Sequence, residues 1–292
     1  MIRGSIVALV TPFDISGAVD YEALERLVEF HVSEGTHAIV AVGTTGESAT
    51  LSHSEDRDVI KATVDFVAGR IPVIAGAGSN ATAEACQLTE SATLAGADAI
   101  LSVAPYYNKP PQAGLLAHFR AVAESTNLPV ILYNVPGRTV TDIADDTTLE
   151  LATVPNIAGI KDATGDLNRA KYILAHRPDG FAVYSGDDPT AMELCLLGGD
   201  GDISVTANVA PRLMASMIES ALAGKVEEAE AANNQLRGLH SELFIEPNPI
   251  PSKWVLSEMG IIRSDCRLPL VPLTDSGRTA VREACGMAGI NL

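Results

Sequence analysis

The sequence predicts an α/β protein that folds as a (β/α)8 TIM barrel with a C-terminal helical appendage. Eight short, nearly continuous apolar segments alternate with amphipathic helical segments at a spacing of roughly 30 residues. Such continuous apolar strands are typical of a parallel sheet that helices cover on both faces. The length of 292 residues fits one such barrel, which takes about 250 residues, and an extension. A doubly wound open sheet is the alternative, but no G-x-G-x-x-G motif follows the first segment, and an eighth unit favours closure.

Each predicted strand is a short apolar run bounded by proline, glycine or polar residues. The first run ends in Thr-Pro, and the sixth carries a lysine close to its C-terminal end. The eight predicted strands are Ser5–Pro12, Ala38–Gly43, Pro72–Gly78, Ala99–Pro105, Pro129–Pro136, Ile157–Thr164, Phe181–Gly186 and Gly201–Thr206.

The helices between these strands show apolar residues at helical spacing, and Asp20 is placed to cap the first of them. Those predicted within the barrel are Tyr21–Ser33, Ser54–Ala68, Ala81–Leu94, Gln112–Ser125, Thr147–Ala152 and Pro211–Leu222. Further helical stretches exceed what a barrel needs: Val226–Phe244, Lys253–Met259 and Ser276–Ala288. We therefore divide the chain into a catalytic barrel, residues 1–222, and a C-terminal helical extension, residues 223–292. Within the extension, the three prolines of Glu246–Pro251 predict an extended connector.

The composition, with 47% hydrophobic and 20% charged residues, is typical of a soluble globular protein. A net charge of −17 argues against nucleic acid and anionic membranes as partners, because both need basic patches. The four cysteines form no C-x-x-C pair and the six histidines lack metal-ligand spacing, so neither a metal nor a disulfide is expected. No apolar run suits a signal peptide or a transmembrane helix, which favours a cytoplasmic protein.

Lys161 lies inside an apolar strand, although lysine is rarely buried. It could simply end the strand and reach solvent. Alternatively it points into a desolvated barrel mouth, where burial disfavours the ammonium and leaves an amine nucleophile. Alternation along the strands places Gly159 on the same face as Lys161, and Tyr133 at a similar height on the fifth strand. A phenol beside this amine could shuttle protons during imine formation, although a lone strand tyrosine usually just fills the core.

Two segments after strand ends could hold an anion. The turn-prone residues Gly43-Thr-Thr-Gly-Glu47 let backbone N–H groups converge, but they lack the pattern of a phosphate loop, so a carboxylate suits them better than a nucleotide. An ordinary turn leading into a helix explains that segment about equally well. Arg138 could clamp a second carboxylate through its bidentate guanidinium, or could be a solvated loop residue.

Several motifs together carry a family resemblance over nearly the whole chain. They are Gly43-Thr-Thr-Gly-Glu-Ser48, Pro105-Tyr-Tyr-Asn108, Leu132-Tyr-Asn-Val-Pro136 followed by Arg138, Gly159-Ile-Lys161, Ser185-Gly-Asp187, Ile203-Ser-Val-Thr-Ala-Asn208 and Glu246-Pro-Asn-Pro249. With them the sequence resembles the dihydrodipicolinate synthases, which are pyruvate-dependent class I aldolases related to N-acetylneuraminate lyase. Thr-Thr-Gly-Glu and Gly-Ile-Lys are shared across that superfamily.

The resemblance implies a lyase that condenses pyruvate with L-aspartate-4-semialdehyde, the first committed step of diaminopimelate and lysine biosynthesis. Lys161 would form the Schiff base, Tyr133 would donate and accept protons, and Thr44 with Tyr107 from a neighbouring subunit would complete a proton relay. The residues that would bind substrate are Thr45, Ile203 through its backbone, Arg138 and Gly186. No cofactor is implied, because the imine itself withdraws electrons from the substrate.

The resemblance also implies a homo-oligomer, usually a tetramer made of two tight dimers, and a regulatory site for L-lysine. The matching positions are Ser48, Ala49, His53, Asn80, Glu84 and Tyr106. Asp56 stands where lysine-sensitive enzymes of the enterobacterial type have histidine, and we predict moderate inhibition by lysine. One alternative function is that of a sialic acid or sugar-acid aldolase, but Arg138 and the Tyr106-Tyr107 pair favour the synthase. The other alternative is a non-catalytic binding protein, which would not need Lys161 and Tyr133 together.

Overall fold

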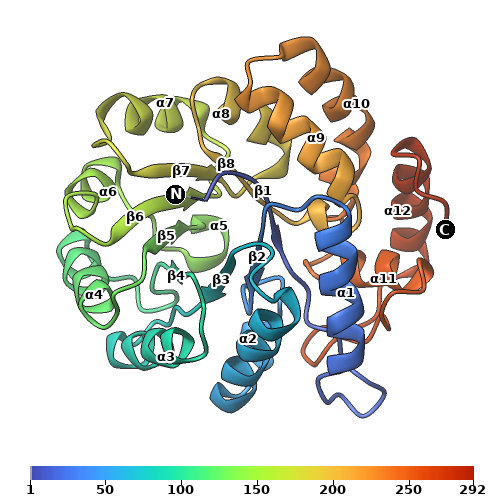
Figure 1. Ribbon diagram of the computed structural model, residues 1–292, viewed down its shortest axis with the longest axis horizontal. Coiled ribbons are helices and arrows are strands. Elements are labelled where there is room, and N and C mark those ends of the chain that lie inside the picture. Colours follow the sequence, from blue (N-terminus) through green and yellow to red (C-terminus); the bar gives the residue numbers. More distant parts are fainter. Residues whose placement is uncertain (1) are drawn as a thin grey trace.

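The eight strands form one closed parallel barrel in which each strand pairs with its neighbours in chain order and β8 pairs with β1. This is a computed structural model, and it describes residues 2–292. Figure 1 shows the strands at the centre, the helices around them, and α10, α11 and α12 together on one side. The predicted barrel with C-terminal helices is confirmed.

All eight predicted strands are present, but each ends earlier than its apolar run. Residues such as Leu9 and Val42 stay buried after leaving the sheet, so the apolar run continues into the loops at the barrel mouth. The observed strands are β1 Gly4–Ala8, β2 Ala38–Ala41, β3 Val73–Gly76, β4 Ala99–Val103, β5 Val130–Asn134, β6 Ile157–Asp162, β7 Ala182–Ser185 and β8 Gly201–Ser204.

The helices around the barrel follow the predicted positions within a few residues, and the Asp20 side chain caps α1 by accepting from the Ala23 amide. They are α1 Tyr21–Ser33, α2 His53–Val67, α3 Thr82–Leu94, α4 Gln112–Glu124, α6 Asp145–Leu151 and α9 Pro211–Leu222. Three helices were not predicted from the sequence: the one-turn α5 Pro136–Thr139, α7 Leu167–His176 and the short α8 Ala191–Leu196. Of the helices in residues 2–292, none is both long and apolar enough to cross a membrane.

The C-terminal extension contains α10 Val226–Glu242, α11 Ile250–Glu258 and α12 Asp275–Met287. The predicted extended connector is wrong at its end, because Ile250 and Pro251 form the first turn of α11. Proline fits there, since the first helical amides have no partner within the helix anyway. Helix α10 packs on α9 and on α12. The division at residues 222 and 223 remains a proposal.

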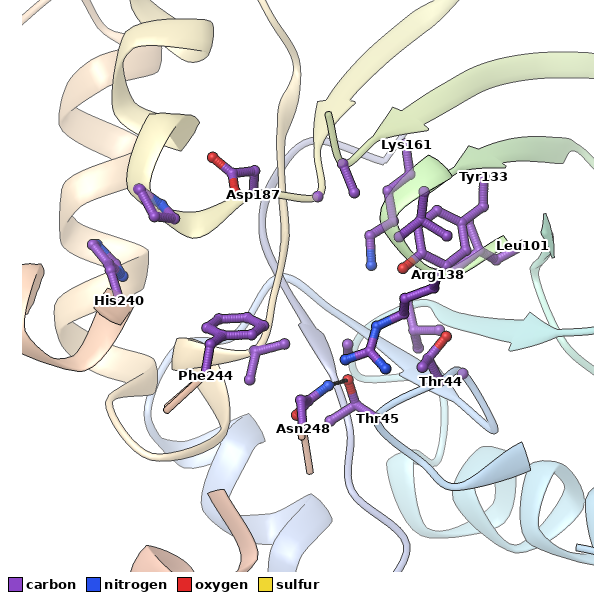
Figure 2. Close-up of a pocket in the computed structure, with 18 of the residues that line it drawn as sticks. Thr44, Thr45, Leu101, Tyr133, Arg138, Lys161, Asp187, His240, Phe244 and Asn248 are labelled. Atoms are coloured by element: carbon purple, nitrogen blue, oxygen red, sulfur yellow. Dashed lines mark hydrogen bonds between the residues drawn. The ribbon is translucent and has the colours of Figure 1, made fainter. Parts of the chain in front are cut away.

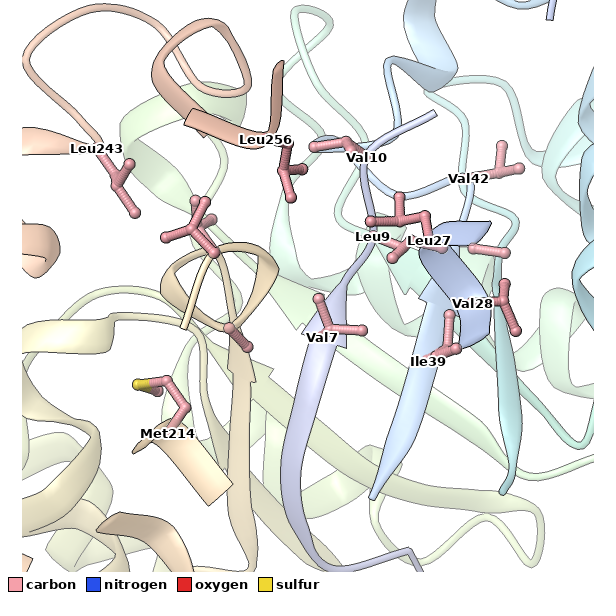
Figure 3. Packing of buried hydrophobic residues seen from close by; sticks show 14 of the residues in the cluster. Val7, Leu9, Val10, Leu27, Val28, Ile39, Val42, Met214, Leu243 and Leu256 are labelled. Carbon is pink, nitrogen blue, oxygen red and sulfur yellow. The ribbon is translucent and has the colours of Figure 1, made fainter. Parts of the chain in front are cut away.

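The core has an inner and an outer layer. Inward residues of the strands, among them Ile6, Val40 and Tyr184, fill the barrel itself. A second layer lies between the strands and the helices, and Figure 3 shows Val7 and Leu27 in it. Leu243 and Leu256 of the extension belong to that same outer cluster, so the extension shares the core of the barrel.

Candidate active site

A cavity of about 340 Å³ opens at the C-terminal ends of the strands, where barrels of this kind carry their active sites. Strands β5 and β6, the loops after β2 and β7, and the end of α10 all contribute to its wall (Figure 2). The predicted site residues that line it are Thr44, Thr45, Tyr133, Arg138, Lys161 and Gly186.

Lys161 and Tyr133 are direct neighbours across β6 and β5. The Lys161 Nζ lies 4.4 Å from the centroid of the Tyr133 ring. Both side chains are buried, with 5% and 8% exposure, and Tyr133 belongs to the cluster inside the barrel, as alternation predicts. No carboxylate in residues 2–292 lies within ion-pair distance of Lys161 Nζ. The structure therefore presents a buried amine without a counterion, beside a phenol, at the wall of a cavity.

The loop Gly43–Glu47, here called the β2 loop, has fewer amides available to bind an anion than the sequence suggests. The amides of Gly46 and Glu47 bond to carbonyl groups within the loop itself. In the described chain, the amides of Gly43, Thr44 and Thr45 have no hydrogen-bond partner and could still bind a ligand. The Thr45 Oγ1 accepts a hydrogen bond of 2.9 Å from Asn248 Nδ2, which leaves the hydroxyl proton of Thr45 available for donation.

Arg138 lies on the one-turn helix α5 and also lines the cavity. Its side chain is exposed, and within residues 2–292 it makes no ion pair. A free guanidinium at the cavity can bind a carboxylate through two parallel hydrogen bonds. The cavity thus offers two anion-binding groups, the β2 loop and the Arg138 guanidinium.

Gly186 leaves room for the lysine. A Cβ built at this position would lie 2.7 Å from Lys161 Cε and 2.9 Å from the Ala163 Cβ. The glycine is therefore required by the path of the Lys161 side chain.

Replacing Gly186 by alanine is expected to lower kcat/KM for the first substrate by roughly 10- to 100-fold, because the Lys161 amine must move from its position. Steady-state kinetics at varied substrate will measure this. Gly286→Ala is the matched control, since nothing lies within 4 Å of a Cβ there. A Gly186→Ala enzyme with unchanged kcat/KM would contradict this view of the packing.

Two predicted site residues do not line the cavity. Ile203 is 1% exposed and packs inside the barrel. Tyr107 is 88% exposed, with its backbone in the left-handed region at a φ of 75°, and it lines neither of the two cavities described here. Its exposure is what a residue reaching into another subunit would show, and its role stays a prediction.

A second cavity of about 410 Å³ lies beside the first, and Thr44, Tyr133 and Arg138 contribute to both walls. It contains most of the residues expected to bind lysine, namely Ser48, Ala49, His53, Glu84 and Tyr106. Asn80 does not line it and instead accepts a hydrogen bond from the Asn108 side chain through its carbonyl. Asp56 does line it, and burial raises the pKa of this carboxyl to about 7.

The buried Asp56 should make the folded protein less stable as the pH rises. Its folded-state pKa lies above that of the unfolded chain, so the folded state binds the extra proton and loses this advantage between about pH 4 and pH 7. Asp56→Asn should remove this loss, and at pH 8 it should be more stable by about 1–3 kcal/mol. Denaturant unfolding of both proteins at pH 5 and pH 8 will test it, and an equal pH dependence would contradict it.

Part of the cavity wall comes from the C-terminal extension, which was not predicted from the sequence. His240 and Ser241 at the end of α10, and Phe244 and Asn248 in the turn after it, line the cavity. Asn248 stands between two prolines in the motif Glu246-Pro-Asn-Pro249. Among residues 2–292, no cluster of three or more histidine, cysteine, aspartate or glutamate side chains is arranged to hold a metal.

Comparison with known proteins agrees with the fold and the motifs. The model of the dihydrodipicolinate synthetase family matches residues 1–287. The 4-hydroxy-tetrahydrodipicolinate synthase of Stutzerimonas stutzeri is 58% identical over 290 residues, covering 99% of both chains.

Solved structures of similar sequence share the whole fold. Dihydrodipicolinate synthase from Acinetobacter baumannii, a chloride-inhibited enzyme complexed with pyruvate, is 54% identical, with a TM-score of 0.98 and full coverage of both chains. The enzyme from Cyanidioschyzon merolae with lysine bound is 41% identical, with a TM-score of 0.96 and 99% coverage of both chains. This chain belongs to the dihydrodipicolinate synthetase family.

Proposed function

We propose that this enzyme condenses pyruvate with L-aspartate-4-semialdehyde through a Schiff base on Lys161, as a 4-hydroxy-tetrahydrodipicolinate synthase. The observation that carries the proposal is the buried Lys161 amine, which has no counterion in the described chain and lies over Tyr133 at a cavity with two anion-binding groups. The names of the full-length relatives support the same reaction.

In the first half of the reaction, the Lys161 amine attacks C2 of pyruvate, and the carbonyl oxygen leaves as water after Tyr133 has supplied protons. The amides of Thr44 and Thr45 and the Thr45 hydroxyl bind the pyruvate carboxylate, which is the anion that fits the narrow β2 loop. The cationic imine nitrogen then withdraws electrons, so C3 loses a proton and becomes a nucleophilic enamine. No metal or organic cofactor is needed for this activation.

In the second half, the enamine carbon attacks the aldehyde carbon of the semialdehyde, whose oxygen takes up a proton and remains as a hydroxyl group. Arg138 holds the semialdehyde carboxylate at the cavity rim. The amino group of the semialdehyde then attacks the imine carbon, closes a six-membered ring and frees Lys161. The net reaction joins the two substrates and releases one water molecule.

Among aldolases, the synthase fits this cavity better than a sugar-acid aldolase. The second substrate of a synthase carries a carboxylate, which suits the free Arg138 guanidinium.

One experiment separates these possibilities. The protein is incubated with pyruvate and borohydride, the adduct is located by peptide mass mapping, and semialdehyde turnover is assayed in parallel. We expect an adduct on Lys161 together with turnover. The absence of an adduct contradicts every aldolase function, whereas an adduct without turnover contradicts only the synthase.

We also infer that the second cavity binds L-lysine as an inhibitor. His53 can meet the carboxylate of lysine, while Glu84 and Asp56 can meet its amino groups, and all three line the cavity. Because Thr44, Tyr133 and Arg138 belong to both walls, a bound effector would touch the catalytic side chains directly.

Lysine added to the assay is expected to inhibit moderately, and norleucine, which lacks the side-chain amine, should not inhibit. Activity measured against rising lysine will show this. Flat activity well above millimolar lysine would contradict the regulatory site.

The exposed Tyr107 supports a homo-oligomer, in which this residue enters the neighbouring subunit's site. We propose a tetramer built from two tight dimers.

A further inference from the structure

A second buried lysine, Lys253, lies behind the β2 loop. It is fully buried on α11, and its ammonium donates to the Glu47 carboxylate and, at 2.8 Å, to the Asp265 carbonyl. Its Nζ also lies 4.1 Å from the centroid of the Phe13 ring. Unlike Lys161, it lines neither cavity and is neutralised, so it is no candidate nucleophile.

Glu47, the partner of Lys253, is the last residue of the β2 loop and has a left-handed backbone with a φ of 57°. Residues other than glycine are rare in this region and persist where their surroundings hold them. Its side chain is 1% exposed, and its second carboxylate oxygen accepts from the Arg267 amide at 3.0 Å. The Arg267 side chain in turn donates to the Thr50 carbonyl at 2.9 Å.

These contacts fix the loop from the side of the extension. The Glu47 amide bonds to the Thr44 carbonyl at 3.1 Å, so the anchored residue is tied to the start of the loop. Thr44 and Thr45, whose amides remain free for a ligand, lie between Gly43 and the anchored end. A shift of Glu47 therefore changes the direction in which these amides point.

We propose that Lys253 is a positioning residue for the reaction: through its buried ion pair with Glu47, it holds the β2 loop in the conformation that binds the pyruvate carboxylate. This inference rests on the proposed function, since it assigns the loop to pyruvate. Through this ion pair, the C-terminal extension helps to position the substrate-binding loop of the active site, although Lys253 itself touches no substrate.

The alternative is a purely structural ion pair, and a double variant separates the two. Lys253→Met alone leaves the Glu47 carboxylate buried without a partner, which destabilises a protein strongly. Glu47→Gln with Lys253→Met removes both charges and keeps an acceptor for the Arg267 amide, a change that folded proteins often tolerate. Arg282→Met is the control, because it removes an ion pair with Glu258 on the outer side of the same helix, α11.

For each protein, the melting temperature, the KM for each substrate and the rate of borohydride trapping at low pyruvate are measured. We expect the double variant to fold, with a KM for pyruvate raised about tenfold or more and a KM for the semialdehyde changed less than about twofold. The control should keep both KM values within about twofold.

The proposal is overturned if the double variant folds and binds pyruvate like the wild type, or if its two KM values rise together. It is also overturned if neither variant folds, because the pair then serves folding itself. A wild-type protein that forms no pyruvate adduct contradicts the proposed function instead, and thus the two failures are distinguishable.

Discussion

Lys161→Ala is expected to lower kcat by at least about 10³-fold, because it removes the one lysine among residues 2–292 that lines the cavity and could form an imine. The variant should remain folded. Lys161 makes no direct ion pair in the described chain, so its removal breaks none, and it relieves the cost of burying an amine. Turnover, borohydride trapping with pyruvate, and thermal unfolding measure the three parts of this prediction.

The matched control is Lys171→Ala, which removes an exposed lysine on α7 and should leave turnover unchanged. Turnover of Lys161→Ala close to that of the wild type would exclude the Schiff-base mechanism. Loss of both turnover and the folded state would mean instead that the lysine is needed for packing.

The architecture was predictable because each strand of a parallel barrel is buried on both faces and so reads as a continuous apolar run. Alternation along β5 and β6 then sufficed to bring Tyr133 and Lys161 together. The ends of the strands were less predictable, because residues such as Val42 stay buried after the backbone has left the sheet. Burial determines the composition of a segment, whereas its hydrogen bonds determine where the strand ends.

The contribution of the extension to the site could not be predicted from local patterns. Asn248 contacts Thr45 across 203 positions of the chain, and Lys253 contacts Glu47 across 206. Nothing in the periodicity of either segment indicates such a partner. One signal was present, since Lys253 lies next to Trp254-Val-Leu256 and is as unusual in an apolar segment as Lys161.

The contrast between these two lysines shows how one residue type takes two roles. Both are buried, but Lys253 meets the Glu47 carboxylate, while Lys161 faces a cavity and an aromatic ring. Lys253 is held by its ion pair and serves structure. Lys161 has no such partner and is left to react, and the anionic groups of the substrate are then bound elsewhere, at the β2 loop and Arg138.

Tyr133→Phe is expected to lower kcat by about 10²- to 10⁴-fold, the usual contribution of a positioned acid–base group. The substitution keeps the ring over which the Lys161 Nζ lies, 4.4 Å from the centroid, so the packing of the lysine is preserved. Only the hydroxyl group that would carry protons is lost. Pyruvate should still form an adduct on Lys161 at a reduced rate, which borohydride trapping over time will measure.

Tyr184→Phe is the matched control, because Tyr184 also belongs to the cluster inside the barrel. Its hydroxyl donates to the Ile2 carbonyl at 2.7 Å, and the residue does not line the cavity. Its loss should cost about 1 kcal/mol of stability and leave kcat unchanged. If the two variants lose activity equally, the effect of Tyr133 is one of packing, but if only Tyr133→Phe is slow, the hydroxyl beside Lys161 takes part in proton transfer.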